Sequence, residues 1–179
     1  YLFDRDPKTA VQFLRRAIDA GGGVVVQHEA YLRLILASPL AGLDPYPVLQ
    51  EAASVYPTSV HVQGGIAVRE MESSNADDQE RGRQRLVQAW LLAEEQGQEV
   101  PFRTNVAALC HNIGVAYERA HAPGRAIIVY HRALKVNPNP AASRQRLAIA
   151  FRQLAENLTA RGDQSTAAAA LDSAQKYDP

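Results

Sequence analysis

Five histidines and a single cysteine are the residues whose chemistry stands out in this sequence. Metal-binding histidines usually come as helical pairs four residues apart, or with cysteines as further ligands. His111, His121 and His131 are spaced ten residues apart instead, and the glutamate after His28 is not followed by the second histidine of a metalloprotease motif. The sequence therefore predicts no metal site and assigns the histidines to the surface or to a groove.

Motifs for nucleophilic catalysis and phosphate binding are also missing from the sequence. Cys110 precedes His111, but a reactive thiol needs an exposed and electropositive setting. The run Gly21–Gly23 is not followed by the Lys-Ser or Lys-Thr of a phosphate loop, and no Gly-x-Ser-x-Gly elbow is present. We therefore predict a protein that is not an enzyme and that uses no cofactor.

Charge and hydropathy limit the partners of the chain. The 179 residues include 19 basic and 19 acidic side chains, so the formal net charge is zero. A neutral chain argues against a nucleic-acid partner, and the basic run Arg81–Arg85 is interpreted as a solvated face. No apolar run approaches the roughly 20 residues that span a bilayer, which predicts no membrane insertion. One cysteine allows no internal disulfide, and we assign the protein to the cytoplasm.

A pattern of small, aromatic and proline residues recurs along the chain. In the best copy the steps are 3, 9, 4, 3 and 5 residues, and the members are Gly114, Tyr117, Ala126, Tyr130, Ala133 and Pro138. A second copy has steps of 3, 16, 4, 3 and 5 residues, through Ala148, Phe151, Ala167, Leu171, Ala174 and Pro179. A third copy has steps of 3, 16, 4 and 3 residues, through Ala67, Glu70, Leu86, Trp90 and Ala93. Such recurrence predicts a repeated structural unit.

Each copy is interpreted as a pair of antiparallel helices. Small residues such as Gly114 and Ala126 let the two helices approach closely, and Tyr117 and Tyr130 fill the space beside that contact. Pro138 cannot continue a helix and ends the second one. The extra residues of the second copy lengthen its first helix, whereas those of the third copy are assigned to loop.

This pattern resembles the tetratricopeptide repeat (TPR), a helix–turn–helix unit of about 34 residues. The segment from Ala107 to Pro140, with "NIGVAY" and "RALKVNPNP", carries the resemblance most fully. The resemblance implies an all-α fold, an α-solenoid of stacked antiparallel helix pairs in a right-handed superhelix. It also places Cys110 where a large apolar residue is usual, so we expect a buried thiol. The segments of this one continuous solenoid are divergent helices at 1–58, a divergent repeat at 59–106, a well-formed repeat at 107–140 and a repeat with an extended first helix at 141–179.

Helical periodicity and end signals predict about nine helices. They lie near residues 7–20, 27–37, 45–56, 59–73, 79–97, 103–120, 123–136, 141–161 and 164–177. Asn139 is expected to cap the helix that starts near 141, and Gly162 and Asp163 are expected to end one helix and cap the next.

The resemblance places the ligand surface on the first helix of each pair, which lines the concave face. Helical spacing leaves a set of positions free of packing there: His61, Val68, His111, Val115, Arg119, Gln145, Ile149 and Arg152. The alternative is that some of these side chains pack against neighbouring helices. One branch of the family holds acidic chaperone tails with paired Lys and Asn residues. His111 and Val115 occupy the matching places here, so that activity is not expected.

The sequence therefore predicts a non-catalytic scaffold that binds a peptide or a helix of a partner protein in its concave groove. Two alternatives stay open. The segment can be the regulatory or substrate-holding arm of a larger enzyme. It can also be a self-assembling module whose uncapped ends stack on one another.

Overall fold

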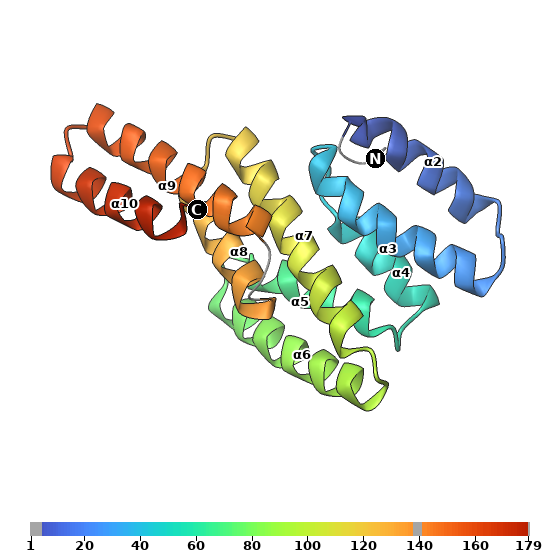
Figure 1. Cartoon of the computed structure of the whole chain (residues 1–179). Coiled ribbons are helices and arrows are strands. Elements are labelled where there is room, and N and C mark those ends of the chain that lie inside the picture. The colour runs from blue at the N-terminus through green and yellow to red at the C-terminus, as the bar shows by residue number, and fades with distance from the viewer. Residues whose placement is uncertain (1–4, 138–140, 179) are drawn as a thin grey trace. The chain divides into compact units, whose positions relative to one another are not determined.

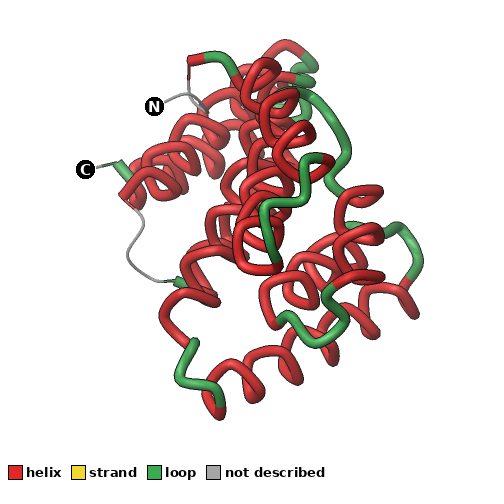
Figure 2. Tube along the Cα trace, turned by 90° about the vertical axis from the view of Figure 1, so that its right-hand side faces the viewer, coloured by secondary structure: helices red, strands yellow, loops and turns green. Residues whose placement is uncertain are grey.

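The computed structural model describes residues 5–137 and 141–178, and the regular elements in these residues are all α-helices (Figure 1). They are α2 (Pro7–Asp19), α3 (Val24–Leu40), α4 (Tyr46–Val55), α5 (Val60–Met71), α6 (Ala76–Glu95), α7 (Glu99–Arg119), α8 (Pro123–Val136), α9 (Ala141–Ala160) and α10 (Gln164–Tyr177). Short turns join most of them, as the green segments of Figure 2 show. The predicted all-α class is confirmed for these residues. None of these helices is long and apolar enough to cross a membrane.

Local sequence signals set several of the helix ends. α8 starts at Pro123, a position where the missing N–H of proline is tolerated. Asp163 caps α10, because its carboxylate accepts a hydrogen bond of 3.1 Å from the Thr166 amide. Gly162 follows α9 with a φ of 83°, a left-handed conformation that glycine adopts without strain. These ends confirm the sequence prediction, whereas the predicted cap at Asn139 lies outside the described residues.

Three helices start at least three residues earlier than expected. α3 begins at Val24 rather than near residue 27. α7 begins at Glu99 rather than near residue 103, because Pro101 falls in its first turn, where no N–H is needed from it. α6 begins at Ala76, after the Asn75 side chain caps it by accepting from the Asp77 amide. The extra residues of the third repeat copy therefore belong to helix α6, which corrects their assignment to loop.

The chain divides into two compact units, residues 1–109 and residues 110–179, and we describe each by itself. Helices that follow one another in the chain pack together within the units, as α5 with α6 and α9 with α10 show in Figure 1. This packing of consecutive helices is consistent with a helical repeat. We call α3, α5, α7 and α9 the first helices, and α4, α6, α8 and α10 the second helices.

In the first unit, first helices lie side by side and run in the same direction. His61 near the start of α5 contacts Asn105 of α7, and one turn later Gly65 faces Leu109. α3 packs against α5 as well. α3, α5 and the start of α7 therefore form one layer, and the partner of α5 in its own pair, α6, runs antiparallel to it.

Two glycines of the first unit mark places where helices approach closely. A Cβ atom on Gly82 of α6 would lie 2.7 Å from the backbone oxygen of Ala67 in α5. A Cβ atom on Gly64 of α5 would lie 2.7 Å from the ring of Phe102 in α7. Normal contacts between carbon atoms are roughly 3.5–4.0 Å, so a larger residue requires a shift. Gly82 lies inside Arg81–Arg85, which the sequence pattern marks only as a solvated face.

In the second unit, the end of α7 packs antiparallel on α8. The Arg125 guanidinium near the start of α8 lies 5.8 Å from the ring centroid of Tyr117, while Tyr130 meets Gly114 one turn earlier on α7. A Cβ atom on Gly114 would lie only 2.4 Å from Cε1 of Tyr130, whose side chain is fully buried. The close helix contact predicted at Gly114 is therefore confirmed, and the group that fills it is the Tyr130 ring.

Candidate functional site

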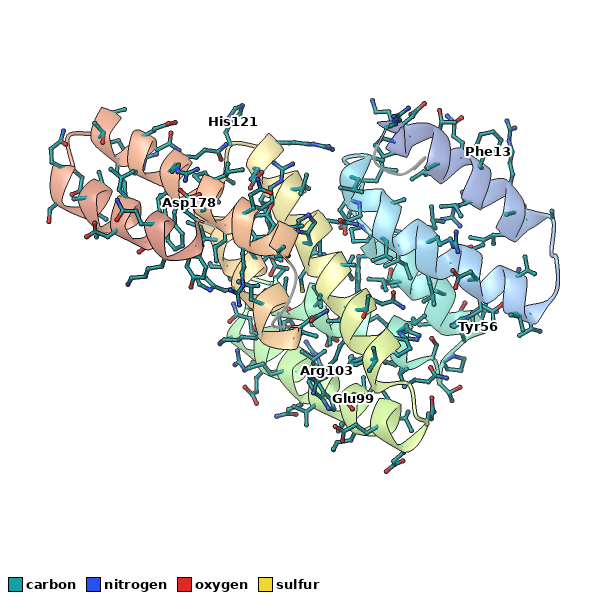
Figure 3. All side chains as sticks on the ribbon, in the orientation of Figure 1. Phe13, Tyr56, Glu99, Arg103, His121 and Asp178 are labelled. Atoms are coloured by element: carbon teal, nitrogen blue, oxygen red, sulfur yellow. The ribbon has the colours of Figure 1, made fainter. Side chains whose placement is uncertain are left out.

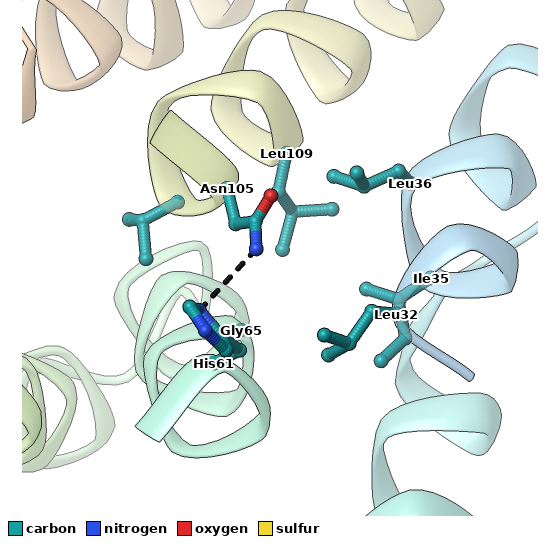
Figure 4. A pocket seen from close by; sticks show the side chains of 8 residues that line it. Leu32, Ile35, Leu36, His61, Gly65, Asn105 and Leu109 are labelled. Carbon is teal, nitrogen blue, oxygen red and sulfur yellow. Dashed lines mark hydrogen bonds between the residues drawn. The ribbon is translucent and has the colours of Figure 1, made fainter. Parts of the chain in front are cut away.

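A cleft in the first unit is lined by first helices. Its walls come from α3, α5 and α7, and the lining residues are Leu32, Ile35, Leu36, His61, Gly65, Asn105, Val106 and Leu109. Figure 4 shows the apolar side chains of α3 on one side and the His61–Asn105 pair on the other. The free volume is about 20 Å³, which is room for one water-sized group. Among the described residues, the second helices contribute nothing to this lining.

The polar part of the cleft is a hydrogen-bonded pair. The amide nitrogen of Asn105 lies 3.3 Å from Nδ1 of His61 and donates to it. The His61 ring is half-buried and lies near Phe102, with 6.3 Å between the ring centroids. Burial lowers the pKa of His61, so the imidazole is neutral near pH 7. Neutral Nδ1 keeps the lone pair that accepts the bond from Asn105.

A second half-buried histidine joins α3 to the start of α5. Nε2 of His28 lies 2.8 Å from the Ser59 hydroxyl, and Ser59 caps α5 by accepting from the Val62 amide. The His28 ring meets Tyr56 edge to face, with 4.8 Å between the centroids. Burial lowers the pKa of His28 too, so this imidazole is also neutral near pH 7.

A wider hollow of about 350 Å³ lies beside these two histidines. Its lining comes from the starts of α3 and α5, the end of α4 and the turn before α7: Val24, Val25, His28, Val55, Tyr56, Pro57, Thr58, Ser59, Val60, His61, Gln96 and Gln98. Val24 and Val25 expose most of their side chains to solvent. No lining residue carries a formal charge while the histidines are neutral, so the hollow suits uncharged groups.

In the second unit, two polar contacts join the first helices α7 and α9. Nδ1 of His111 lies 3.0 Å from the Ser143 hydroxyl, and Arg146 donates to the Glu118 carboxylate at 3.1 Å. Burial lowers the pKa of His111 and raises the pKa of Glu118. The contacts advance along both helices together, so α7 and α9 run in the same direction here, as α5 and α7 do in the first unit.

Two residues predicted to line an exposed groove are buried. Val68 of α5 is 0 % exposed and Val115 of α7 is 7 % exposed. Each directly follows a small residue at a close helix contact, Ala67 or Gly114, so its side chain is enclosed by the packed helices. The expectation that Val68 and Val115 present a surface is wrong for this structure, and the packing alternative holds for both.

The other predicted groove residues are accessible, and they divide between the units. His61 lines the cleft of the first unit. The predicted residues of the second unit are exposed or half-buried: His111, Arg119, Gln145, Ile149 and Arg152. Arg152 forms an ion pair with Asp178 just after α10. A role of these residues in partner binding stays a prediction.

The sequence assigns the histidines to the surface or to a groove, and the structure places His121 at the surface and His28 and His61 in the lining of the cleft or the hollow. Four of the five are half-buried between helices: His28, His61, His111 and His131. His121 is the exposed one, with a φ of 55°, and Figure 3 shows it in the turn between α7 and α8. No three His, Cys, Asp or Glu side chains among the described residues could together hold a metal ion.

Cys110 is enclosed by the packed helices, and two arginines of the basic run Arg81–Arg85 form ion pairs with a neighbouring helix. Cys110 is buried, as expected, and burial raises the pKa of its thiol to about 12. Such a thiol is a poor nucleophile near pH 7, because the thiolate is the reactive form. Arg81 and Arg85 of the basic run both pair with Glu70 of α5. Arg81, Arg83 and Gln84 are nevertheless exposed, which agrees with the predicted solvated face, while the pairs with Glu70 link α6 to α5.

Sequence reasoning did not single out the cleft residues of α3 and α7. Leu32 and Leu36 are four residues apart, and so are Asn105 and Leu109, which places each pair on one face of its helix. That spacing was an available signal. Which helix face meets the cleft depends on the placement of three helices, and helical spacing does not provide it.

Comparison with known proteins gives no indication of the function of this chain. A scan against profiles of known protein families and a search of curated proteins both find no match. We therefore infer function from the lining and the position of the cleft.

Proposed function

We propose that this chain is a TPR-like helical-repeat scaffold that binds a peptide or a helix of a partner protein and catalyses no reaction. The observation that carries the proposal is the cleft, whose lining comes from α3, α5 and α7. We interpret these helices as the first members of successive pairs, and stacked pairs in repeat proteins form extended binding surfaces from equivalent elements.

The packing of the helices supports the repeat. First helices run in the same direction in each unit, and successive helices pack against each other. Close contacts occur at small residues in both units, at Gly82 against α5 and at Gly114 against Tyr130. These are the features expected when one helix pair is repeated along a chain and each pair buries its apolar face on the next.

The chemistry of the cleft suits a protein segment. Leu32, Leu36 and Leu109 give apolar walls, while His61 and Asn105 offer a donor and an acceptor to a backbone amide of the ligand. Ligand sites commonly combine an apolar lining with a few polar groups that fix orientation. The free volume admits the tip of one apolar side chain, and the remainder of the segment would lie along the exposed rim.

The experiment uses peptides selected from a random phage-displayed library with the folded protein as bait. A selected peptide is labelled, and its affinity is measured by fluorescence anisotropy. The double variant Leu32→Asp with Asn105→Ala places a charge in the apolar wall and removes a hydrogen-bond donor. We expect an affinity loss of about tenfold or more, which corresponds to about 1.4 kcal/mol.

Val87→Asp is the matched control, because Val87 lies on the second helix α6 of the same unit and is 59 % exposed. It introduces the same charge outside the cleft and should leave the affinity unchanged. Circular dichroism confirms that both variants are folded. An equal loss in the two variants, or full affinity in the folded cleft variant, contradicts the proposal.

A further inference from the structure

Two neutral imidazoles hold the first turn of α5 in place. His61 is the second residue of α5 and accepts from the amide of Asn105 in α7 at 3.3 Å. Nε2 of His28, on α3, lies 2.8 Å from the hydroxyl oxygen of Ser59, the residue that caps α5. The start of α5 is therefore tied to both neighbouring first helices through histidine side chains, beside the cleft that we propose as the binding site.

The surroundings of these two imidazoles contain few charges. From α3, the Glu29 carboxylate attracts a positive charge on either ring and so raises the pKa of both histidines, but burial lowers the pKa more. Glu29 is itself paired with Arg33 at 2.7 Å. The end of α4 contributes the Tyr56 phenol, which lies edge-on to His28. α7 contributes Asn105 and Phe102, and the turn before α7 contributes Gln96 and Gln98 to the hollow that both histidines line. A positive charge on His28 also lowers the pKa of His61.

We propose that His28 and His61 make the cleft acid-sensitive, so that protonation of the pair loosens the start of α5 and weakens the binding of the partner segment. The effect on binding rests on the proposed function, whereas the loosening of α5 does not. The nearest alternative use of the pair, a metal site, lacks a third ligand among the described residues.

Three physical effects oppose protonation of the pair in the folded state. The positive end of the α5 dipole faces both rings, which disfavours a cation there. A proton on Nδ1 of His61 removes the lone pair that accepts from Asn105. The two imidazolium charges would also repel each other.

The direction of the pH effect follows from linkage. Burial lowers the pKa of both histidines below the ordinary value of 6.5, so the opened state binds protons more readily than the closed one. Opening is therefore favoured as the pH falls below the ordinary histidine value. The adverse contact with the helix dipole is worth about a 1.7- to 5.5-fold change in the opening equilibrium for each histidine, or about three- to thirtyfold for the pair.

Hydrogen exchange tests the loosening without any partner. Protection factors of the α5 amides, corrected for intrinsic exchange, are measured at about pH 7.5 and about pH 5.5, on either side of the ordinary histidine pKa. We expect protection in α5 to fall by about three- to thirtyfold in acid, with a smaller change in α9. The anisotropy assay should show the selected peptide losing affinity over the same interval.

The test variant carries His28→Gln and His61→Asn, which place an amide oxygen near the positions of Nε2 and Nδ1 and cannot titrate. Each protein is compared with itself across pH, and the variant should lose most of the acid response. His131→Gln is the control, because His131 is also half-buried but lies in the other unit, against Phe151 and Tyr177. This control should keep the full response of α5.

The outcomes separate this proposal from the proposed function. Constant α5 protection across pH in the natural protein, or an equal loss in the non-titrating variant, overturns the acid sensitivity. An equal acid-induced loss of peptide affinity in the natural protein and the variant overturns its link to the cleft. If only the proposed function is wrong, no peptide binds at about pH 7.5, while the amide protection of α5 still falls in acid.

Discussion

Gly114 offers the sharpest test of how the helices pack. The change to alanine should stabilise an isolated helix by about 1 kcal/mol, because glycine has the poorer helix propensity. In this protein the new Cβ would lie 2.4, 2.7 and 2.8 Å from Cε1, Cζ and Cδ1 of Tyr130. Normal carbon contacts need about 3.5 Å or more, so ring and helix must separate by roughly 1 Å.

The net effect of Gly114→Ala can be worked from these numbers. Overpacking a filled core costs about 1–3 kcal/mol, and the fully buried Tyr130 ring places this site in the upper part of that range. After subtraction of the gain in propensity, we expect a net loss of about 1–2 kcal/mol. The loss is measured by urea denaturation, followed by circular dichroism.

Gly124→Ala is the matched control, since a Cβ atom there has no neighbour within 4 Å. It should be neutral or stabilising by up to about 1 kcal/mol. In a Tyr130→Leu background, Gly114→Ala should reduce the stability much less, because the aromatic ring that the new Cβ would contact is absent. The reasoning is refuted if Gly114→Ala is as stable as Gly124→Ala in the natural background.

Three further predictions concern helix contacts and pH. Gly82→Ala brings a Cβ to 2.7 Å from a backbone oxygen of α5, so after the gain in helix propensity is subtracted it should destabilise by about 1–2 kcal/mol in a urea titration; a gain in stability would contradict the contact. Asp163→Ala removes the α10 cap and should cost about 0.5–2 kcal/mol, visible as faster amide exchange in α10; unchanged exchange would count against capping. Burial lowers the pKa of His111, so its contribution to stability is present above the unfolded pKa near 6.5 and lost as the pH falls towards the folded value. The melting temperature of the natural protein should therefore fall more between about pH 7.5 and about pH 5 than that of His111→Asn, and equal falls would refute this role.

The helices could be predicted from sequence because their end signals are local. Pro123, Gly162 and Asp163 act on backbone groups within one turn, so the limits of α8 and α10 agree with the expected ranges. Pro101 shows where the approach failed. A proline in the first turn and a proline that breaks a helix look the same in sequence, because the difference depends on where the helix begins.

The candidate binding surface was harder to predict, because it depends on which helix faces meet. Val115 has the spacing of a groove residue, yet its position next to Gly114 places it in the buried contact between helices. His61, a predicted groove residue, lines the cleft, but its partner Asn105 lies 44 residues further along the chain. The stacking of α5 on α7 brings these two residues together, and no local sequence pattern indicates that stacking.

The central claim is that a partner segment lies along the rim of the cleft of α3, α5 and α7 and inserts the tip of one side chain into it. The most direct measurement is an NMR titration of the selected peptide into protein with labelled leucine and valine methyl groups. We predict the largest shift changes at Leu32, Leu36 and Leu109, with little change at Val87 of α6. Largest changes at Val87 and other side chains of the second helices would contradict the account.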